Sequence, residues 1–221
     1  MLETLRDAVL RGDAEASAEL TSEGLGSGLE PEQILNDTLI PTMGIVGEEF
    51  ERGERFIPEM LVSAVAMKAS MAILRPLLAE KGVEPKGKVV IGTVRGDLHD
   101  IGKDLVATML EGAGYEIVDL GVEVTPEAFV DAVREHTPQV VAMSALLTTT
   151  MTHMPAVIGT LCDADLRDSV KVIIGGAPVT ESYAHEIAAD GYAADASSAV
   201  SLVEKLLRGK RFQPSGLKCS A

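Results

Sequence analysis

The feature that most constrains the fold is a change of sequence pattern near residue 82. After it, short runs rich in β-branched residues alternate with helical stretches. The runs are KVVIGTV, YEIVDLG, QVVAMSAL and KVIIGG, with a last strand near Gly191–Ala194. Continuous apolar strands that alternate with helices indicate a parallel sheet covered on both faces. We therefore predict an α/β Rossmann-like domain with a five-stranded parallel sheet over residues 89–208.

Residues 1–82 have apolar positions at helical spacing instead. We expect four helices: Leu2–Leu10, a second capped by Asp13, a third over Glu32–Glu51 with a kink at Pro41, and a long fourth with Pro58 in its first turn. Helices with apolar faces and short connections indicate an antiparallel four-helix bundle.

The stretch between these halves is polar and carries Gly and Pro, which is typical of a linker. We place the linker at residues 83–88, after a helical domain over 1–82. The tail, residues 209–221, is expected to be loose.

The charge balance excludes some partners. The formal net charge is −15, and binding to phosphate groups needs clustered Lys and Arg, so neither nucleic acid nor anionic lipid is expected as a partner. We see no apolar run long enough to span a bilayer, and the N-terminus MLETLRDAVLRGD is unlike a signal or transit peptide. We expect a cytoplasmic protein with no membrane partner.

Three polar or glycine-rich motifs follow strands of the predicted sheet. Residues 96–103 (GDLHDIGK) follow the first strand, residues 144–150 (SALLTTT) the third, and residues 175–178 (GGAP) the fourth. Ligands of a doubly wound sheet bind beyond the carboxyl ends of its strands. All three motifs are therefore candidates for one site.

His99 is the candidate metal ligand of this site. Asp97 lies two residues before it, and a metal-bound imidazole usually has its second nitrogen oriented by such a carboxylate. One histidine does not hold a bare zinc-type ion, which needs about four protein ligands. It can serve a metal whose equatorial positions are filled by a macrocycle, and the glycines at 102, 175 and 176 would let backbone approach such a ring.

Each motif taken alone has a simpler interpretation. Asp100 can cap the helix that starts at Ile101. A loop histidine is usually solvated, a glycine pair after a strand is common, and the Ser/Thr run suits an ordinary helix N-terminus. Their convergence at one sheet edge favours the functional interpretation.

These motifs, in this order and spacing, resemble those of the corrinoid-binding methyl-carrier proteins of methyltransferase systems and of the cobalamin module of methionine synthase. The resemblance covers about residues 3–208. Its signature is Asp-x-His-x-x-Gly, Ser-x-Leu and Gly-Gly, matched here by Asp97-Leu98-His99-Asp100-Ile101-Gly102, Ser144-Ala145-Leu146 and Gly175-Gly176.

The resemblance implies a role for each of these residues. His99 would be the lower axial cobalt ligand, hydrogen-bonded to Asp97, with the hydroxyl of Thr150 completing the relay. Ser144 and Thr148 would bond to the nucleotide tail of the cofactor, and the glycines would make room for it. The remaining cofactor-binding residues would be Leu98, Asp100, Ile101, Leu146 and Ala196. Phe50 and Ile57, in a segment (46–64) that also resembles the family, would cap the methyl face of the ring.

The implied function is methyl transfer. The protein would carry a methyl group on the cobalt of a corrinoid (cobalamin or a relative) that alternates between methyl-Co(III) and Co(I). A substrate:corrinoid methyltransferase would load the methyl group from a methylamine, methanol, a betaine or a methoxyaromatic. A corrinoid:acceptor methyltransferase would deliver it to a thiol such as coenzyme M or to tetrahydrofolate, and a reductive activator would rescue oxidised cobalt. The chain itself would be a non-catalytic carrier component.

Three other classes share part of this pattern. A cobalamin-binding subunit of a mutase has the signature but lacks the helical cap. A cobalamin-sensing regulator would carry a basic DNA-binding module, whereas residues 1–82 are acidic. A receiver or flavodoxin-like module is the class without a corrinoid, and a receiver needs paired acidic residues after its first strand, which IGTVRG does not provide.

Overall fold

The computed structural model describes residues 1–208, so the predicted loose tail lies outside the described residues. The chain forms two compact units. One comprises Met1–Lys86 together with Thr108–Tyr115, and the other comprises Gly87–Ala107 and the described chain from Glu116 onward.

The first unit contains the predicted helices. They are α1 (Leu2–Arg11), α2 (Ala14–Gly26), α3 (Pro31–Ile34), the π-helical η1 (Leu35–Leu39), α4 (Ile40–Glu51) and α5 (Ile57–Glu80). Asp13 caps α2 as expected, because its carboxylate accepts the N–H of Ala16 at 3.0 Å. The interior of this unit is aliphatic and methionine-rich, with Leu5, Val9, Ile34, Leu39, Met43, Met60, Met67 and Leu74 buried.

The predicted third helix is interrupted before Pro41. Proline has no N–H for the carbonyl four residues earlier, which is that of Asp37. The structure accommodates this loss with the π-helical stretch Leu35–Leu39, after which Pro41 lies in the first turn of α4. The irregularity that the sequence predicts therefore takes the form of a π-helical turn.

Helix α5 corrects one expectation. It has 24 residues and a mean hydropathy of 1.5 over its most apolar window, so by length and composition it could cross a membrane. The statement that no apolar run is long enough was therefore wrong. Core helices of soluble proteins pass the same test, and 39% of that window is buried in the structure. The buried residues of α5 include Met60, Met67 and Leu74.

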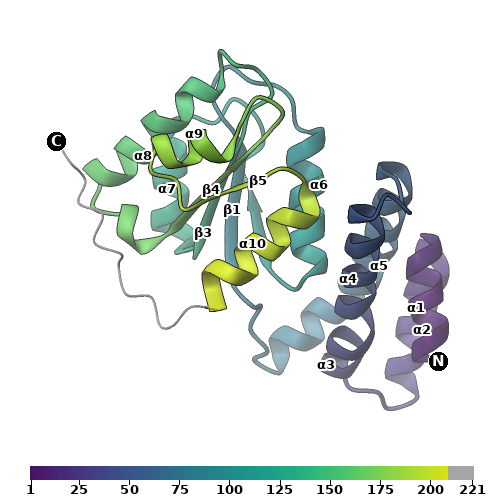
Figure 1. Cartoon of the computed structure of the whole chain (residues 1–221). Coiled ribbons are helices and arrows are strands. Elements are labelled where there is room, and N and C mark those ends of the chain that lie inside the picture. Colours follow the sequence, from purple (N-terminus) through teal and green to yellow (C-terminus); the bar gives the residue numbers. More distant parts are fainter. Residues whose placement is uncertain (209–221) are drawn as a thin grey trace. The chain divides into compact units, whose positions relative to one another are not determined.

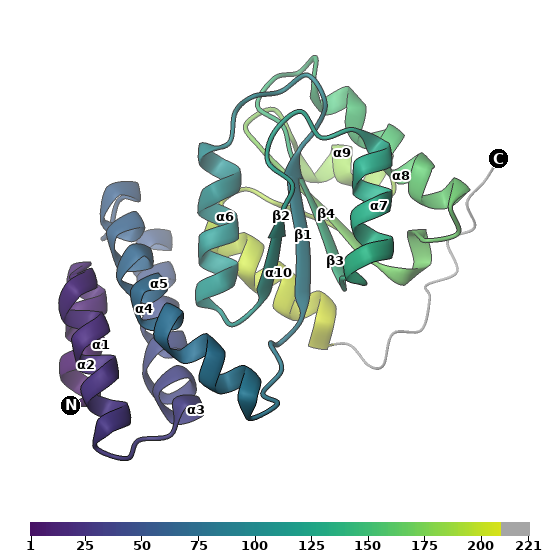
Figure 2. The same ribbon diagram turned by 180° about the vertical axis from the view of Figure 1, so that it is seen from behind.

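The second unit is a parallel five-stranded sheet with the order β2-β1-β3-β4-β5. Its strands are β1 (Lys88–Thr93), β2 (Glu116–Asp119), β3 (Val140–Ser144), β4 (Lys171–Gly175) and β5 (Gly191–Ala193). Helices α7 (Pro126–His136), α8 (Met154–Asp163) and α9 (Glu181–Glu186) cover one face, as Figures 1 and 2 show from opposite sides. On the other face lie α10 (Ala196–Arg208) and the part of α6 (Ile101–Gly112) that belongs to this unit, residues 101–107. The predicted fold class is confirmed.

The main core of this unit lies under α7 and α8. Alternate strand residues point into it, so Val90, Val141 and Val172 pack with Phe129 of α7 and Met154 of α8. All five side chains are essentially inaccessible to solvent. This core holds the strands in register and so positions the loops that follow them.

Candidate functional site

The strand register aligns the ends of four strands. Thr93 of β1 pairs with Ser144 of β3, Ser144 pairs with Gly175 of β4, and Gly175 pairs with Ala193 of β5. The three motifs singled out in the sequence therefore begin from one row of residues across the carboxyl edge. The strand order reverses direction between β1 and β3, which is where ligands of this fold class bind.

Asp97 is the centre of a hydrogen-bond network at this point. The residue is fully buried. Its Oδ1 accepts the backbone N–H of His99 at 3.1 Å and lies 2.7 Å from His99 Nδ1. Its Oδ2 accepts the backbone N–H of Leu146 at 2.7 Å and the hydroxyl of Thr150 at 2.6 Å. One carboxylate thus joins the loop after β1 to the loop after β3.

This network determines the charge of Asp97. Burial by itself would raise the pKa of the carboxyl, but the hydrogen bonds from Thr150, Leu146 and His99 outweigh it and hold the pKa of Asp97 well below its usual range. Asp97 is consequently a carboxylate that can only accept hydrogen bonds.

The anionic state of Asp97 in turn selects the tautomer of His99. Because the carboxylate has no proton to donate, His99 Nδ1 must carry the hydrogen between them, and Nε2 of the neutral ring keeps its lone pair. The side chain of His99 retains 52% of its accessible surface. The ring is therefore oriented from one side and open on the other, as a metal ligand requires.

Thr93 is a residue of this site that the sequence interpretation missed. It is fully buried at the end of β1, and its hydroxyl donates to the carbonyl of His99 at 3.1 Å. A threonine near the end of an apolar strand is common, so only its position in the same row as Ser144 and Gly175 marks it. Thr93 and Asp97 together hold the backbone of His99, one through its carbonyl and the other through its N–H.

The surroundings of His99 are apolar and exposed. Leu98 and Ile101 are 66% and 75% exposed, and Leu146 and Leu147 are 43% and 44% exposed. Exposed aliphatic side chains next to an oriented imidazole suit a flat, largely apolar ring that would cover them. In the described residues no group of three or more His, Cys, Asp or Glu could hold a metal ion, so a ring that supplies the other ligands fits this donor set better than a bare ion.

The other predicted residues lie at the same edge. Ser144 is half-buried at the end of β3, Thr148 is exposed in the following loop, and Ala196 is buried at the start of α10. Asp100 is exposed and its carbonyl accepts the N–H of Asp104 at 2.7 Å.

The three glycines differ in what a side chain would meet. A Cβ on Gly176, whose φ is +122°, would lie 1.8 Å from the carbonyl oxygen of Ala145. One on Gly175 would lie 2.9 Å from that of Ala193, whereas one on Gly102 would meet nothing within 4 Å. Gly176 and Gly175 therefore allow neighbouring backbone segments to approach, and Gly102 leaves open space.

Phe50 and Ile57 belong to the helical unit. Phe50 is half-buried on α4, and Ile57 is 44% exposed at the first position of α5. Phe56, which the sequence interpretation did not select, is 68% exposed.

Family models and curated proteins match most of the chain. Models described as a B12 binding domain match residues 87–201 and residues 1–75. A corrinoid protein of Desulfitobacterium hafniense is 41% identical over 210 residues, which cover 94% of this chain and 97% of that protein. Trimethylamine corrinoid protein 1 of Methanosarcina acetivorans is 42% identical over 204 residues, which cover 91% and 94%.

A solved structure extends the similarity to the fold over 95% of this chain. The methanol:cobalamin methyltransferase complex of Methanosarcina barkeri has a chain that matches with a TM-score of 0.85 and 27% identity, over 95% of this chain and 80% of that chain. The cofactor of the present chain is accordingly a corrinoid. The chain belongs to the corrinoid proteins of methyltransferase systems.

Proposed function

We propose that this protein carries a methyl group between two methyltransferases, one that loads it from a small methylated substrate and one that delivers it to an acceptor. The observation that carries the proposal is the chain of hydrogen bonds from Thr150 through Asp97 to His99, whose imidazole side chain is half-exposed. When bound, the corrinoid supplies the cobalt centre that accepts and releases the methyl group.

The residues of the chain would bind and orient that group. His99 Nε2 would be the lower axial ligand, while Asp97 holds the proton on Nδ1 and so keeps Nε2 available. Leu98, Ile101 and Leu146 would lie against the ring. Ser144, Thr148, Gly102, Gly175, Gly176 and Ala196 would line the course of the nucleotide tail.

The helical unit would shield the reactive face. Phe50 and Ile57 are the side chains we assign to this cap, and partly exposed apolar groups suit the exclusion of water. We assign residues 1–82 to the cap domain, 83–88 to the linker and 89–208 to the corrinoid-binding domain.

The partners follow from the proposed cycle. The similar corrinoid protein of Methanosarcina acetivorans is named for trimethylamine, and the similar solved chain comes from a methanol:cobalamin methyltransferase complex. We therefore propose a methylamine- or methanol-specific methyltransferase as the loading partner. The delivering partner would use a thiol such as coenzyme M or tetrahydrofolate, a reductive activator would restore oxidised cobalt, and the system would work in the cytoplasm.

The test compares two histidines at the same edge of the sheet. The protein is reconstituted with cobalamin, reduced to Co(II) and examined by electron paramagnetic resonance, with 15N-labelled histidine. In wild type we expect the nitrogen splitting from the axial ligand to change when the histidine is labelled. This dependence on the label should be lost in His99→Ala and should persist in His153→Ala, whose residue lies in the turn after β3. A His99→Ala protein whose splitting still changes with labelled histidine would refute the assignment.

A second measurement addresses the cap. Replacing Phe50 and Ile57 together by Ala should accelerate the photolysis of bound methylcobalamin, because the separated radical pair escapes more readily. Circular dichroism controls for loss of helix. An unchanged photolysis rate in a folded double variant would show that both residues only pack within the bundle and do not shield the methyl group.

A further inference from the structure

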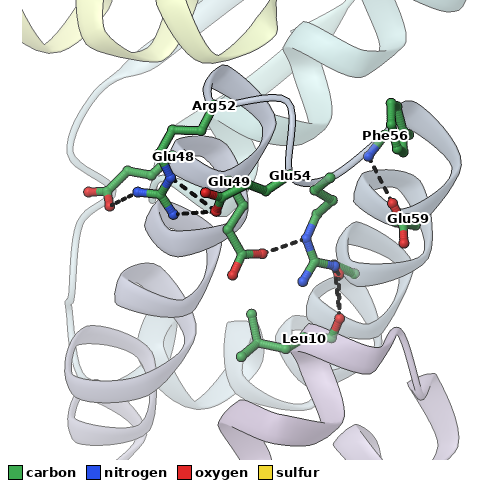
Figure 3. Close-up of polar contacts among 9 residues, drawn as sticks. Leu10, Glu48, Glu49, Arg52, Glu54, Phe56 and Glu59 are labelled. Atoms are coloured by element: carbon green, nitrogen blue, oxygen red, sulfur yellow. Dashed lines mark hydrogen bonds and ion pairs between the residues drawn. The ribbon is translucent and has the colours of Figure 1, made fainter.

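Arg52 and Arg55, in the connection between α4 and α5, have the same charge and different surroundings. Figure 3 shows Arg52 beside Glu48 and Glu54. Arg52 is 54% exposed and pairs with Glu54 at 2.9 Å and with Glu48 at 3.9 Å, both of them exposed. Surface pairs of this kind contribute little to a fold. Arg55, three residues later, has a side chain that is only 15% exposed.

The guanidinium of Arg55 contacts three helices. Its Nε donates to Oε2 of Glu49 on α4 at 2.8 Å. Its Nη1 donates to the carbonyl of Leu10 on α1 at 2.9 Å and to the hydroxyl of Ser63 on α5 at 3.1 Å. Arg55 therefore joins α1, α4 and α5 through one planar group.

The Leu10 carbonyl explains why a cation is present here. It belongs to the last turn of α1, where carbonyls have no partner within the helix and the helix dipole attracts positive charge. The buried Ser63 also donates to this carbonyl, at 3.2 Å. Arg55 thus neutralises Glu49 and completes the end of α1 at the same time.

The two residues that follow Arg55 lie at the start of α5, where a backbone hydrogen bond fixes the chain and both side chains are exposed. The N–H of Phe56 donates to Oε2 of Glu59 at 2.9 Å, which begins α5. Phe56 is 68% exposed and Ile57 is 44% exposed, so two large apolar side chains point out of the unit directly after an anchored arginine. The connection can turn because Gly53 has a φ of +69°.

We infer that Arg55 is a positioning residue that fixes the orientation of Phe56 and Ile57 for the cap. This inference rests on the proposed function, in which Ile57 shields the bound corrinoid. It adds that Phe56 and Ile57, one and two residues after Arg55, are oriented by the half-buried ion pair of Arg55 and Glu49, and not only by the packing of the bundle.

The experiment uses the matched pair Arg55→Gln and Arg52→Gln in the full chain. Glutamine at position 55 cannot reach the three partners at once and leaves the half-buried Glu49 without its cation. In the protein without corrinoid, hydrogen–deuterium exchange of the peptide over 52–58 should be at least several-fold faster in Arg55→Gln and unchanged in Arg52→Gln. Arg55→Lys keeps the charge but loses the planar guanidinium that donates to several partners. Its exchange rate should lie between those of wild type and Arg55→Gln.

With methylcobalamin bound, Arg55→Gln should photolyse several-fold faster than wild type, while its affinity for methylcobalamin stays within about twofold. A variant with a lower melting temperature but wild-type exchange and photolysis rates, measured far below melting, would overturn the inference and leave Arg55 as a stabilising residue only. If Arg55→Gln does not fold, Glu49→Gln removes one charge of the pair and should change both rates in the same direction. Unchanged rates in a folded Glu49→Gln protein would then overturn it.

The two proposals fail in different ways. If the double Ala variant of Phe50 and Ile57 leaves photolysis unchanged, the proposed cap is wrong. The exchange measurement needs no cofactor, so wild-type exchange in a folded Arg55→Gln protein counts against Arg55 alone.

Discussion

The Nδ1 atom of His99 lies 2.7 Å from Oδ1 of Asp97, and the second oxygen of the same carboxylate lies 2.6 Å from the hydroxyl of Thr150. Asp97 thereby couples an exposed imidazole to a buried hydroxyl in the next loop. Substitutions at Asp97 and at Thr150 test this coupling.

The first prediction concerns Asp97→Asn. The amide oxygen of Asn is expected to take the bonds from Leu146 and Thr150, which places its NH₂ group against His99 Nδ1. Nδ1 must then accept, and the ring proton moves to Nε2. We expect 15N chemical shifts of the neutral His99 ring to show this change of tautomer, and the reconstituted Co(II) protein to lose axial histidine at neutral pH. A wild-type tautomer in Asp97→Asn would contradict the role given to the carboxylate.

The second prediction compares two replacements of Thr150, which is 6% exposed. Thr150→Val removes one of the two donors to Oδ2 of Asp97 and should lower the free energy of unfolding by about 1–3 kcal/mol, because a buried carboxylate oxygen keeps only the N–H of Leu146. Thr150→Ser keeps the hydroxyl and should cost less. Urea unfolding of the two variants measures the difference, and equal losses would show that the hydroxyl contributes no more to stability than the methyl group does.

How far the site could be predicted depends on what each contact is made of. The strands, the helices and the alignment of the motifs after β1, β3 and β4 follow from apolar periodicity and from the geometry of parallel sheets. The donor from Leu146 is a backbone N–H, which any residue provides, and so it has no sequence signal. The same holds for the carbonyl of Leu10, whose partner Arg55 is distant in the sequence.

Irregular backbone conformation was the second feature that could not be predicted in detail from the sequence. A proline inside a helical pattern predicts an interruption, but whether the chain kinks or widens into a π turn depends on packing around Leu35–Leu39. Gly175 and Gly176 illustrate the converse. Their place after a strand suggested room for a cofactor tail, and the structure shows that a side chain on either would meet the backbone of a neighbouring segment.

The third prediction uses Lys103, which is 3% exposed and contacts Asp104 at 2.6 Å and also Asp119. Burial lowers the pKa of Lys103, but the two carboxylates outweigh burial and raise it above its usual range. A raised pKa in the folded state stabilises the protein fully below the unfolded pKa, about 10.4, and this stabilisation is lost as the pH rises through the folded value.

Wild type should therefore lose unfolding free energy more steeply above about pH 10.4 than Lys103→Met does. Lys88→Met is the matched control, because Lys88 pairs with Glu116 at 3.0 Å at the opposite end of β1 and β2 and is less buried. Urea unfolding at several alkaline pH values measures the slopes. Parallel curves for wild type and Lys103→Met would mean that Asp104 and Asp119 do not hold the proton on Lys103 as described.

The last prediction separates glycines that serve the fold from one that serves the cofactor. Gly176→Ala places a methyl group against the carbonyl of Ala145 at a φ of +122°, so it should lower the free energy of unfolding by at least about 1–3 kcal/mol. Gly102→Ala places a methyl group in open space in the first turn of α6 and should leave the stability unchanged or raise it by up to about 1 kcal/mol.

If Gly102 makes room for the corrinoid, the same stable Gly102→Ala protein should bind cobalamin at least tenfold more weakly than wild type. Equilibrium titration of the protein with aquocobalamin provides the affinity, and urea unfolding without cofactor provides the stability. Because the added methyl group meets no protein atom within 4 Å, a loss of affinity without a loss of stability can only come from the ligand side. An unchanged affinity would remove Gly102 from the binding surface and leave the glycine as a feature of the loop before α6.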